Sequence, residues 1–318
     1  NWRVHFADTM RGGQYLNNPR MAEFHAQEAA ARVHELEAWG AVFDRTADGR
    51  ILQRNFGGHR YPRLAHVGDR TGLEMIRTLQ NHGIHQGIEV YMECKIERLL
   101  KDGDRVCGAF GYWRNTGKLV LFKARAVVLA TGGIGANLDL VRRHWPARMG
   151  RPPKRMLSGV PDHVDGSGLF LAERAGARLV NLDRMWHYPE GVENHTPIWT
   201  GHGIRILPGP SPLWVDATGK RLPPPLFPGF DALETLRYLR STGFDWSWFI
   251  LDLATLKKEF ALSGSEQNPD LTGKSWLGVV RNRLLGPAAP VRAFLERGKD
   301  FLVAQDLSEL MRKMEALA

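Results

Sequence analysis

The 318-residue chain carries 43 Lys and Arg against 34 Asp and Glu, and 43% of its residues are hydrophobic. A chain of this length buries a large core and usually forms two domains, and no apolar run approaches the ~20 residues of a membrane span. The net charge of +9 is scattered without a run of five basic residues, so we expect no nucleic-acid interface.

The two cysteines, Cys94 and Cys107, have neither the spacing of a zinc site nor that of a disulfide framework. Both lie in apolar, strand-like surroundings, so we expect buried thiols, no metal site and a reducing, cytoplasmic location. The chain begins without a Met or a signal peptide and ends inside an apolar stripe. We therefore expect a fragment of a longer protein.

The front of the chain predicts two helices. Asn18-Pro19 combines an N-cap with proline at the first helical position, and Gly40 is a stop signal. Residues 71–74 fit a capping box that begins a second helix, which Gly83 is expected to end.

Strands are predicted next, because the period of the hydrophobic pattern changes. Apolar and polar residues alternate over 88–96, and turn signals separate this strand from strands over 105–112 and 119–122. Residues 126–130 are continuously apolar, as in a parallel strand buried on both faces. The order predicts an α/β (α+β) fold in which an antiparallel meander is followed by a parallel sheet.

The rear half gives weaker signals. Residues 167–175 predict a helix, 176–182 a strand, and the Pro- and Gly-rich stretch 196–231 mostly loop. A last helix is expected to begin at Asp306.

The glycines that follow the apolar run 126–130 are the most informative short motif. Glycine just past the carboxyl end of a buried strand lets the backbone approach a ligand, at the edge where open α/β sheets bind nucleotides. The alternative is an ordinary tight turn between strand and loop.

Four segments together resemble one family. Residues 6–13 (FADTMRGG), 48–59 (DGRILQRNFGGH), 69–72 (DRTG) and 130–133 (ATGG) resemble, in order and spacing, the succinate dehydrogenase/fumarate reductase flavoprotein. The resemblance, which covers residues 1–135, implies an FAD-dependent oxidoreductase with a partial FAD-binding domain over residues 1–187 and a capping domain over 188–318. It implies FAD as the cofactor and a reaction at a CH–CH bond.

The resemblance also implies site residues. The implied cofactor-binding residues are Gly12, Gly13, Cys94, Lys95, Ala130, Thr131, Gly132, Gly133, Asp165 and Ser167. The implied substrate-side residues, beside the flavin ring and the dicarboxylate pocket, are Phe56, Gly57, Gly58 and His59. One departure is that the family's Gly-Asp-Gly reads Gly166-Ser167-Gly168 here, with Asp165 displaced by two positions.

The rest of the chain resembles a sister branch. Residues 185–191, 203–210 and 258–269 look like bacterial FAD-binding dehydrogenases related to ketosteroid dehydrogenases, a likeness that covers 138–318. The change falls near residues 133–138. We expect a mosaic made by recombination or by design, and a natural protein between the two branches is the alternative.

The catalytic candidates come from this rear half. Where succinate dehydrogenases carry His-Pro-Thr-Gly, the chain reads Tyr188-Pro189-Glu190-Gly191, with His187 one residue early and Arg205 farther on. His187, Tyr188 and Arg205 have the chemistry to move or hold a proton beside a hydride transfer. The alternative is that His187 and Tyr188 only pack and that Arg205 faces solvent, and succinate specificity is not supported.

Two functional hypotheses follow. The first is an FAD-dependent dehydrogenase or reductase that acts on a small molecule at a CH–CH bond. The second is a non-catalytic fragment or chimera that cannot bind FAD by itself, because the GxGxxG fingerprint that holds the FAD pyrophosphate is absent. The succinate branch would add iron–sulfur and membrane-anchor subunits, and a peripheral position at the inner face of the membrane.

Overall fold

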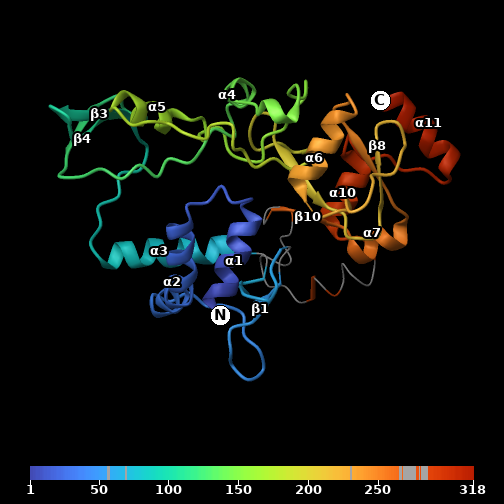
Figure 1. The fold of residues 1–318 in the computed structure, drawn as a ribbon, viewed down its shortest axis with the longest axis horizontal. Coiled ribbons are helices and arrows are strands. Elements are labelled where there is room, and N and C mark those ends of the chain that lie inside the picture. The colour runs from blue at the N-terminus through green and yellow to red at the C-terminus, as the bar shows by residue number, and fades with distance from the viewer. Residues whose placement is uncertain are drawn as a thin grey trace. The chain divides into compact units, whose positions relative to one another are not determined.

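The computed structural model describes residues 1–55, 58–68, 70–229, 231–264, 267, 277–278, 280 and 286–318. The chain divides into two compact units, which are described separately (Figure 1). Unit 1 comprises residues 1–89 with 264–285, and unit 2 comprises residues 90–263 with 286–318. The predicted domain limit between residues 187 and 188 remains a prediction.

Unit 1 is mostly helical. Its elements are α1 (Trp2–Gly12), α2 (Pro19–Ala38), β1 (Gln53–Arg54), β2 (Leu64–Ala65) and α3 (Thr71–His85). Helix α2 begins as predicted, because the Asn18 side chain accepts a hydrogen bond from the Met21 amide at 3.2 Å. Phe43 and Val67 are buried in a small core against α2.

The predicted capping box of α3 is wrong, although the helix begins at Thr71. The Thr71 hydroxyl accepts a hydrogen bond from the Val67 amide at 2.9 Å. Glu74 instead turns toward the preceding loop, where its carboxylate accepts from the Val42 amide at 3.0 Å and pairs with Arg77 at 2.6 Å. A tertiary partner therefore replaced the local one, and α3 continues two residues beyond Gly83.

The predicted meander is confirmed in unit 2. Strands β3 (Cys94–Asp102), β4 (Arg105–Trp113) and β5 (Leu119–Lys123) form an antiparallel sheet in that order. The first strand begins later than predicted, since the last residue of β4, Trp113, already pairs with Cys94. Cys94 and Cys107 are free and half-buried rather than buried, because this sheet leaves most of its residues partly exposed.

The predicted parallel strand 126–130 is not formed. These residues lie outside every strand of the described chain, and Val128 is 89% exposed. A strand buried on both faces needs neighbouring strands, whereas the strand pairs in the described sheets are all antiparallel. The predicted strand 176–182 is also absent, and Asn181 adopts a left-handed conformation with a φ of 58°. The mixed α/β class itself is confirmed.

The rest of unit 2 contains short elements around a second core. They are α4 (Leu138–Arg143), η1 (Ala147–Met149), α5 (Ser167–Arg174), β6 (Gly191–Glu193), β7 (Gly203–Leu207), β8 (Leu213–Asp216), α6 (Ala232–Ser241), β9 (Ser247–Ile250), α7 (Leu253–Glu259), β10 (Ala261–Leu262), α10 (Ala289–Arg297) and α11 (Leu307–Leu317). The predicted helices α5 and α11 are confirmed, and Asp306 caps α11 by accepting from the Glu309 amide at 2.8 Å.

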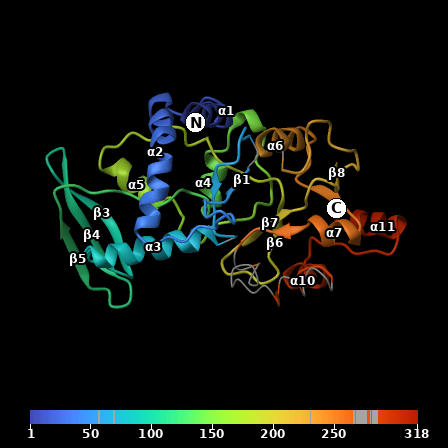
Figure 2. The ribbon, with the colours of Figure 1, turned by 90° about the horizontal axis from the view of Figure 1, so that it is seen from below.

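Strands β7 and β8 lie inside the stretch 196–231 that we predicted to be mostly loop. Prolines flank both strands. Every second residue of this part of β7, Ile204 and Ile206, nevertheless points into a core centred on Phe294, which is 0% exposed. In Figure 2, β6 and β7 lie near α10, which carries Phe294. Burial of alternate side chains thus makes a strand where local turn residues predict a loop.

No described helix is long and apolar enough to cross a membrane. In the described part of the chain, no group of three His, Cys, Asp or Glu side chains is placed to hold a metal ion.

Candidate functional site

Predicted cofactor residues from three segments of unit 2 come together. The turn after residue 129 packs on the first turn of α5, and α5 lies beside β3 (Figure 1). The approach is close, because a Cβ placed on Gly168 would lie 1.7 Å from Thr131 Oγ1. The cluster, called the glycine-turn cluster below, contains Cys94, Lys95, Ala130, Thr131, Gly132, Gly133, Asp165 and Ser167.

Asn137 joins the segment after the turn at residues 130–133 to the segment before α5. Its side-chain oxygen caps α4 by accepting from the Leu140 amide at 3.0 Å, and its amide nitrogen donates to the Asp165 carbonyl at 3.2 Å. The neighbouring Ala136 amide donates to the Val164 carbonyl at 3.0 Å. Sequence reasoning missed Asn137, although an Asn directly before an apolar and acidic first turn is a recognisable N-cap signal.

Two glycines beside the cluster, Gly166 and Gly168, are required by conformation or space. Gly166 has a φ of 86°, a left-handed conformation that favours glycine, and its Cβ would meet Ile134 at 2.9 Å. Gly168 leaves room for Thr131, as described above. Gly133 differs, because a Cβ there would meet nothing within 4 Å. Its backbone is therefore open to a ligand.

The charged residues of the cluster are already paired. Asp165 accepts a hydrogen bond from the Ser167 amide at 2.8 Å, and Lys95 lies 2.9 Å from Glu97. Burial raises the pKa of Asp165, but hydrogen bonds from Ser167 and the charge of Lys95 outweigh it, so the net pKa is lowered. The hydrogen bond with Glu97 raises the pKa of Lys95. Both groups are ionised at neutral pH.

These features fit one part of FAD better than the other. Val128 and Leu129, which precede the turn at residues 130–133 in the sequence, are exposed, and apolar side chains are what a flat, largely apolar ring contacts. A diphosphate needs cations or free amides, whereas Lys95 pairs with Glu97 and the Ser167 amide with Asp165. The cluster therefore offers a cofactor open backbone at Gly133, whereas its Lys95 ammonium and Ser167 amide are already paired.

Arg205 is held from two sides in unit 2. Its guanidinium carbon lies 3.9 Å from the centre of the Tyr188 ring, and its Nε lies 3.3 Å from the Glu190 carboxylate. Strand pairing sets this geometry, because Arg205 in β7 faces Gly191 in β6. Glu190 is only 4% exposed and was not among the predicted site residues. Glu190 belongs to the Tyr-Pro-Glu-Gly segment, which the sequence had already singled out for Tyr188.

His187 lies in a different environment from Arg205. Its ring packs 4.8 Å from that of Trp145, and its Nε2 is buried without a hydrogen-bond partner among the described residues. Burial lowers the pKa of His187. The side chain is therefore neutral at pH 7.

The pKa of His187 predicts acid sensitivity of unit 2. Because its folded pKa lies below the unfolded value, the unfolded chain binds the proton first as the pH falls. We expect the free energy of unfolding to decrease as the pH drops below about 6.5, and His187→Phe to weaken this decrease. Urea unfolding of both proteins at pH 5 and pH 7.5 measures it. If wild type and His187→Phe lose the same free energy of unfolding between pH 7.5 and pH 5, the lowered pKa is wrongly assigned to His187.

The predicted substrate-side residues of unit 1 lie beside a buried carboxylate. Asp8 in α1 is 4% exposed and contacts three arginines, Arg11, Arg60 and Arg63. Arg11 also donates to the carbonyl of Gly58 at 3.2 Å, next to His59. Gly12 and Gly13 follow Arg11 at the end of α1. Phe56 and Gly57 lie outside the described residues.

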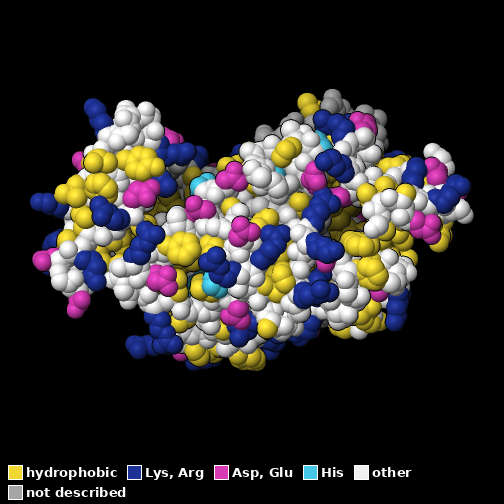
Figure 3. Space-filling model, turned by 90° about the horizontal axis from the view of Figure 1, so that it is seen from above, with side chains coloured by type: hydrophobic (Ala, Val, Ile, Leu, Met, Phe, Trp, Pro, Cys, Tyr) yellow, Lys and Arg dark blue, Asp and Glu magenta, His cyan; other side chains and the backbone are white. Residues whose placement is uncertain are grey.

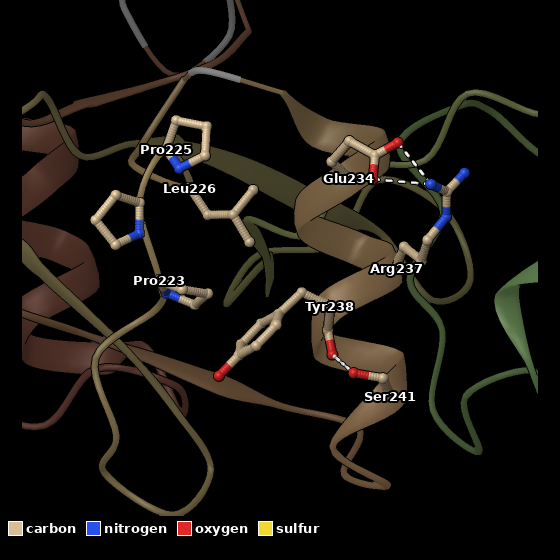
Figure 4. Close-up of a pocket in the computed structure, with 8 residues that line it drawn as sticks. Pro223, Pro225, Leu226, Glu234, Arg237, Tyr238 and Ser241 are labelled. Carbon is tan, nitrogen blue, oxygen red and sulfur yellow. Dashed lines mark hydrogen bonds and ion pairs between the residues drawn. The ribbon is translucent and has the colours of Figure 1, made fainter.

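A hollow in unit 2 is lined by none of the predicted site residues. It has a volume of about 470 Å³ and is lined by Pro223, Pro224, Pro225, Leu226, Glu234, Arg237, Tyr238 and Ser241. Figure 4 shows the Tyr238 ring across from the prolines and the Glu234–Arg237 ion pair on α6. The hollow is mostly apolar, and the pKa of Tyr238 is raised by burial and by Asp216. The hollow is therefore better suited to contact with an apolar group than to proton transfer by Tyr238.

Basic residues are interspersed with acidic ones. On the face drawn in Figure 3, Lys and Arg lie among acidic and hydrophobic side chains. In unit 2, Arg155 contacts both Glu193, at 2.5 Å, and Asp300, at 3.4 Å.

The sequence profile of one family, described as the FAD binding domain, matches residues 1–308. A KsdD-like steroid dehydrogenase of Mycobacterium tuberculosis (strain CDC 1551 / Oshkosh) is 54% identical over 220 residues, which cover 69% of this chain and 39% of that protein. The fumarate reductase flavoprotein subunit of the same strain is 32% identical over 189 residues, which cover 59% of this chain and 30% of that protein.

Solved structures show the same fold. Mycobacterium smegmatis Sdh1 in complex with UQ1 is 35% identical, with a TM-score of 0.58 over 94% of this chain and 47% of that one. The open conformation of a flavocytochrome c3 fumarate reductase, 23% identical, gives a TM-score of 0.63 over 93% of this chain and 50% of that one. The chain spans about two fifths of the first curated relative. Because the profile covers residues 1–308, the chain belongs to the FAD binding domain family, whose cofactor is FAD.

Proposed function

We propose that the protein to which this chain belongs is an FAD-dependent dehydrogenase or reductase acting at a CH–CH bond. The observation that carries the proposal is the glycine-turn cluster. The start of β3, the turn at residues 130–133 and the first turn of α5 are far apart in the sequence, yet they meet around an open backbone. In unit 2, Cys94, Gly132 and Gly133 would hold the adenosine part of FAD, chiefly through their backbone.

When bound, FAD supplies the acceptor or donor of a hydride. The role of this chain is to bind and orient. Arg205 is a fixed cation, because the Glu190 carboxylate and the Tyr188 ring restrain its guanidinium. It would hold an electronegative oxygen of the substrate, or a proton beside the reacting carbon. His187 is neutral and buried, so its part would be to support the segment before Tyr188.

The substrate class follows from the two branches. The relatives include a KsdD-like steroid dehydrogenase and a fumarate reductase flavoprotein. The rear half carries the Arg205 site and lacks the His-Pro-Thr-Gly motif, which favours a small molecule of the steroid type over succinate. For the succinate branch we would expect iron–sulfur and membrane-anchor subunits, with the protein at the inner face of the membrane. For the steroid branch we would expect a cytoplasmic enzyme.

A second proposal is that this chain, taken alone, does not bind FAD. The specific observation in its favour is that the amide of Ser167 and the ammonium of Lys95 are already paired. A fragment with these contacts offers the diphosphate little, even if the adenosine surface is intact.

A titration distinguishes the two proposals. The purified chain is mixed with FAD, ADP or riboflavin, and binding is followed by fluorescence and by flavin absorbance after gel filtration. Under the first proposal we expect weak binding of FAD and ADP and none of riboflavin, because the cluster would hold adenosine. A chain that binds none of the three would support the second proposal. A longer protein, including this chain, that is colourless and reduces no dye would overturn the first.

A further inference from the structure

The loop at residues 58–63 is tied to α1 through a single buried side chain. Asp8 Oδ2 accepts from the Arg60 amide at 3.0 Å and from Arg63 Nη1 at 2.9 Å. Asp8 Oδ1 accepts from Arg11 Nη2 at 2.8 Å. Both carboxylate oxygens are therefore used, and two of the three donors belong to the loop.

The same residue also acts through Arg11. Arg11 is one helical turn after Asp8, and its Nη2 donates to the Gly58 carbonyl at 3.2 Å as well as to Asp8. The backbone is thus held at Gly58 and again at Arg60, on the two sides of His59. A loop residue whose two neighbours are both anchored has little freedom to move.

The charges make this anchor difficult to replace. One carboxylate faces three guanidinium groups, which leaves the cluster with a net charge of +2 (three positive charges minus one). Burial raises the pKa of Asp8, but hydrogen bonds from the Arg60 amide and from Arg63 outweigh it, so the net pKa is lowered. Without the carboxylate, Arg60 and Arg63 would repel each other and the loop would lose its attachment.

We propose that Asp8 is a positioning residue, which fixes Gly58 and His59 of the substrate-side loop through the Arg60 amide, Arg63 and Arg11. The assignment of His59 to the substrate side rests on the proposed function. The anchoring of the loop to α1 does not.

The test compares Asp8→Asn with a matched control, Asp48→Asn. Asp48 is also an aspartate of unit 1 paired with an arginine, Arg50 at 2.7 Å, but its side chain is 54% exposed. Trypsin cleavage after Arg60 and Arg63 reports opening of the loop, with circular dichroism as the check of folding. We expect Asp8→Asn to speed this cleavage about tenfold or more, as loss of hydrogen bonds to a charged group predicts, and Asp48→Asn to leave it unchanged. Equal cleavage in both variants would overturn the proposal.

A second readout separates positioning from a simple change of charge. Burial and then Arg63 lower the pKa of His59, whereas Asp8 raises it. If the loop stays fixed in Asp8→Asn, losing the negative charge must lower the pKa of His59 further. If the loop is released, His59 becomes solvated and its pKa rises toward the ordinary value. NMR titration of His59 is expected to show a rise, and a fall or no change would overturn the proposal.

Arg11→Gln covers the case in which Asp8→Asn does not fold. Arg11 is half exposed, and this variant removes only the bond to Gly58 and one bond to Asp8. We expect faster cleavage after Arg60, by a smaller factor than in Asp8→Asn. Cleavage at the wild-type rate would count against the proposal. In the longer protein, a released loop with unchanged KM and kcat would overturn the assignment of His59 to the substrate side, and would leave FAD binding untouched.

Discussion

Replacing Gly168 with alanine is expected to separate the turn at residues 130–133 from α5 and to remove adenosine binding. The added Cβ would lie 1.7 Å from Thr131 Oγ1 and 2.6 Å from Thr131 Cβ. Rotation about χ1 moves the Thr131 hydroxyl but not its Cβ, so the backbone of one segment must shift. Overpacking of this kind typically costs about 1–3 kcal/mol. Hydrogen exchange of residues 126–136 and an ADP titration measure the two effects.

Gly159→Ala is the matched control for this change. Gly159 lies in the same unit, and a Cβ there meets nothing within 4 Å. The control should keep wild-type stability and wild-type ADP binding. If Gly168→Ala behaves like the control, then the turn and α5 do not form one site, and the proposed adenosine surface is wrong.

Phe294→Ala is expected to give the largest loss of stability in unit 2, about 3–5 kcal/mol. Phe294 is 0% exposed and packs in one core with Val192 of β6 and with Ile204 and Ile206 of β7. Truncation to alanine leaves a cavity beneath the hairpin, whose other face carries Arg205. Urea unfolding measures the stability, and hydrogen exchange of residues 190–207 measures the loosening of the hairpin.

Phe227→Ala provides the comparison for a phenylalanine outside this core. Phe227 is 49% exposed in the same unit, so its removal should cost much less than that of Phe294. If both variants lose the same stability, Phe294 is not the centre of the core. If Phe294→Ala unfolds early while exchange at 190–207 is unchanged, the Arg205 site does not depend on this core.

Local sequence signals predicted several elements correctly. The Asn18 cap of α2, the helix expected from Asp306 (α11) and the meander over β3, β4 and β5 were all confirmed. In each case the partners are near in the sequence, within one helical turn or across a tight turn. The Gly103 turn, with a φ of 57°, joins β3 to β4 in this way. Short-range geometry of this kind can be read from residue order alone.

Sequence patterns whose structure depends on a distant part of the chain gave wrong predictions. The apolar run 126–130 predicted a strand buried on both faces, but no described strand lies beside it and Val128 is exposed. Glu74 was expected to cap its own helix and instead bonds the Val42 amide, 32 residues away. Strand β7 was predicted to be loop because prolines flank it. Its strand pattern, in which every second side chain (Ile204 and Ile206) is buried, depends on the distant core around Phe294.

The sequence by itself determined the family and the cofactor and predicted every residue of the glycine-turn cluster, because the order of motifs and the positions of glycines can be read from the residues alone. Only the tertiary structure decided which of them meet. It joined the turn at 130–133 to α5 through Asn137, gave Arg205 the partner Glu190, and placed Asp8 against a loop 52 residues away. The physical reason is that a buried carboxylate or a close backbone approach is defined by its neighbours, and neighbours from distant segments exist only after the chain has folded.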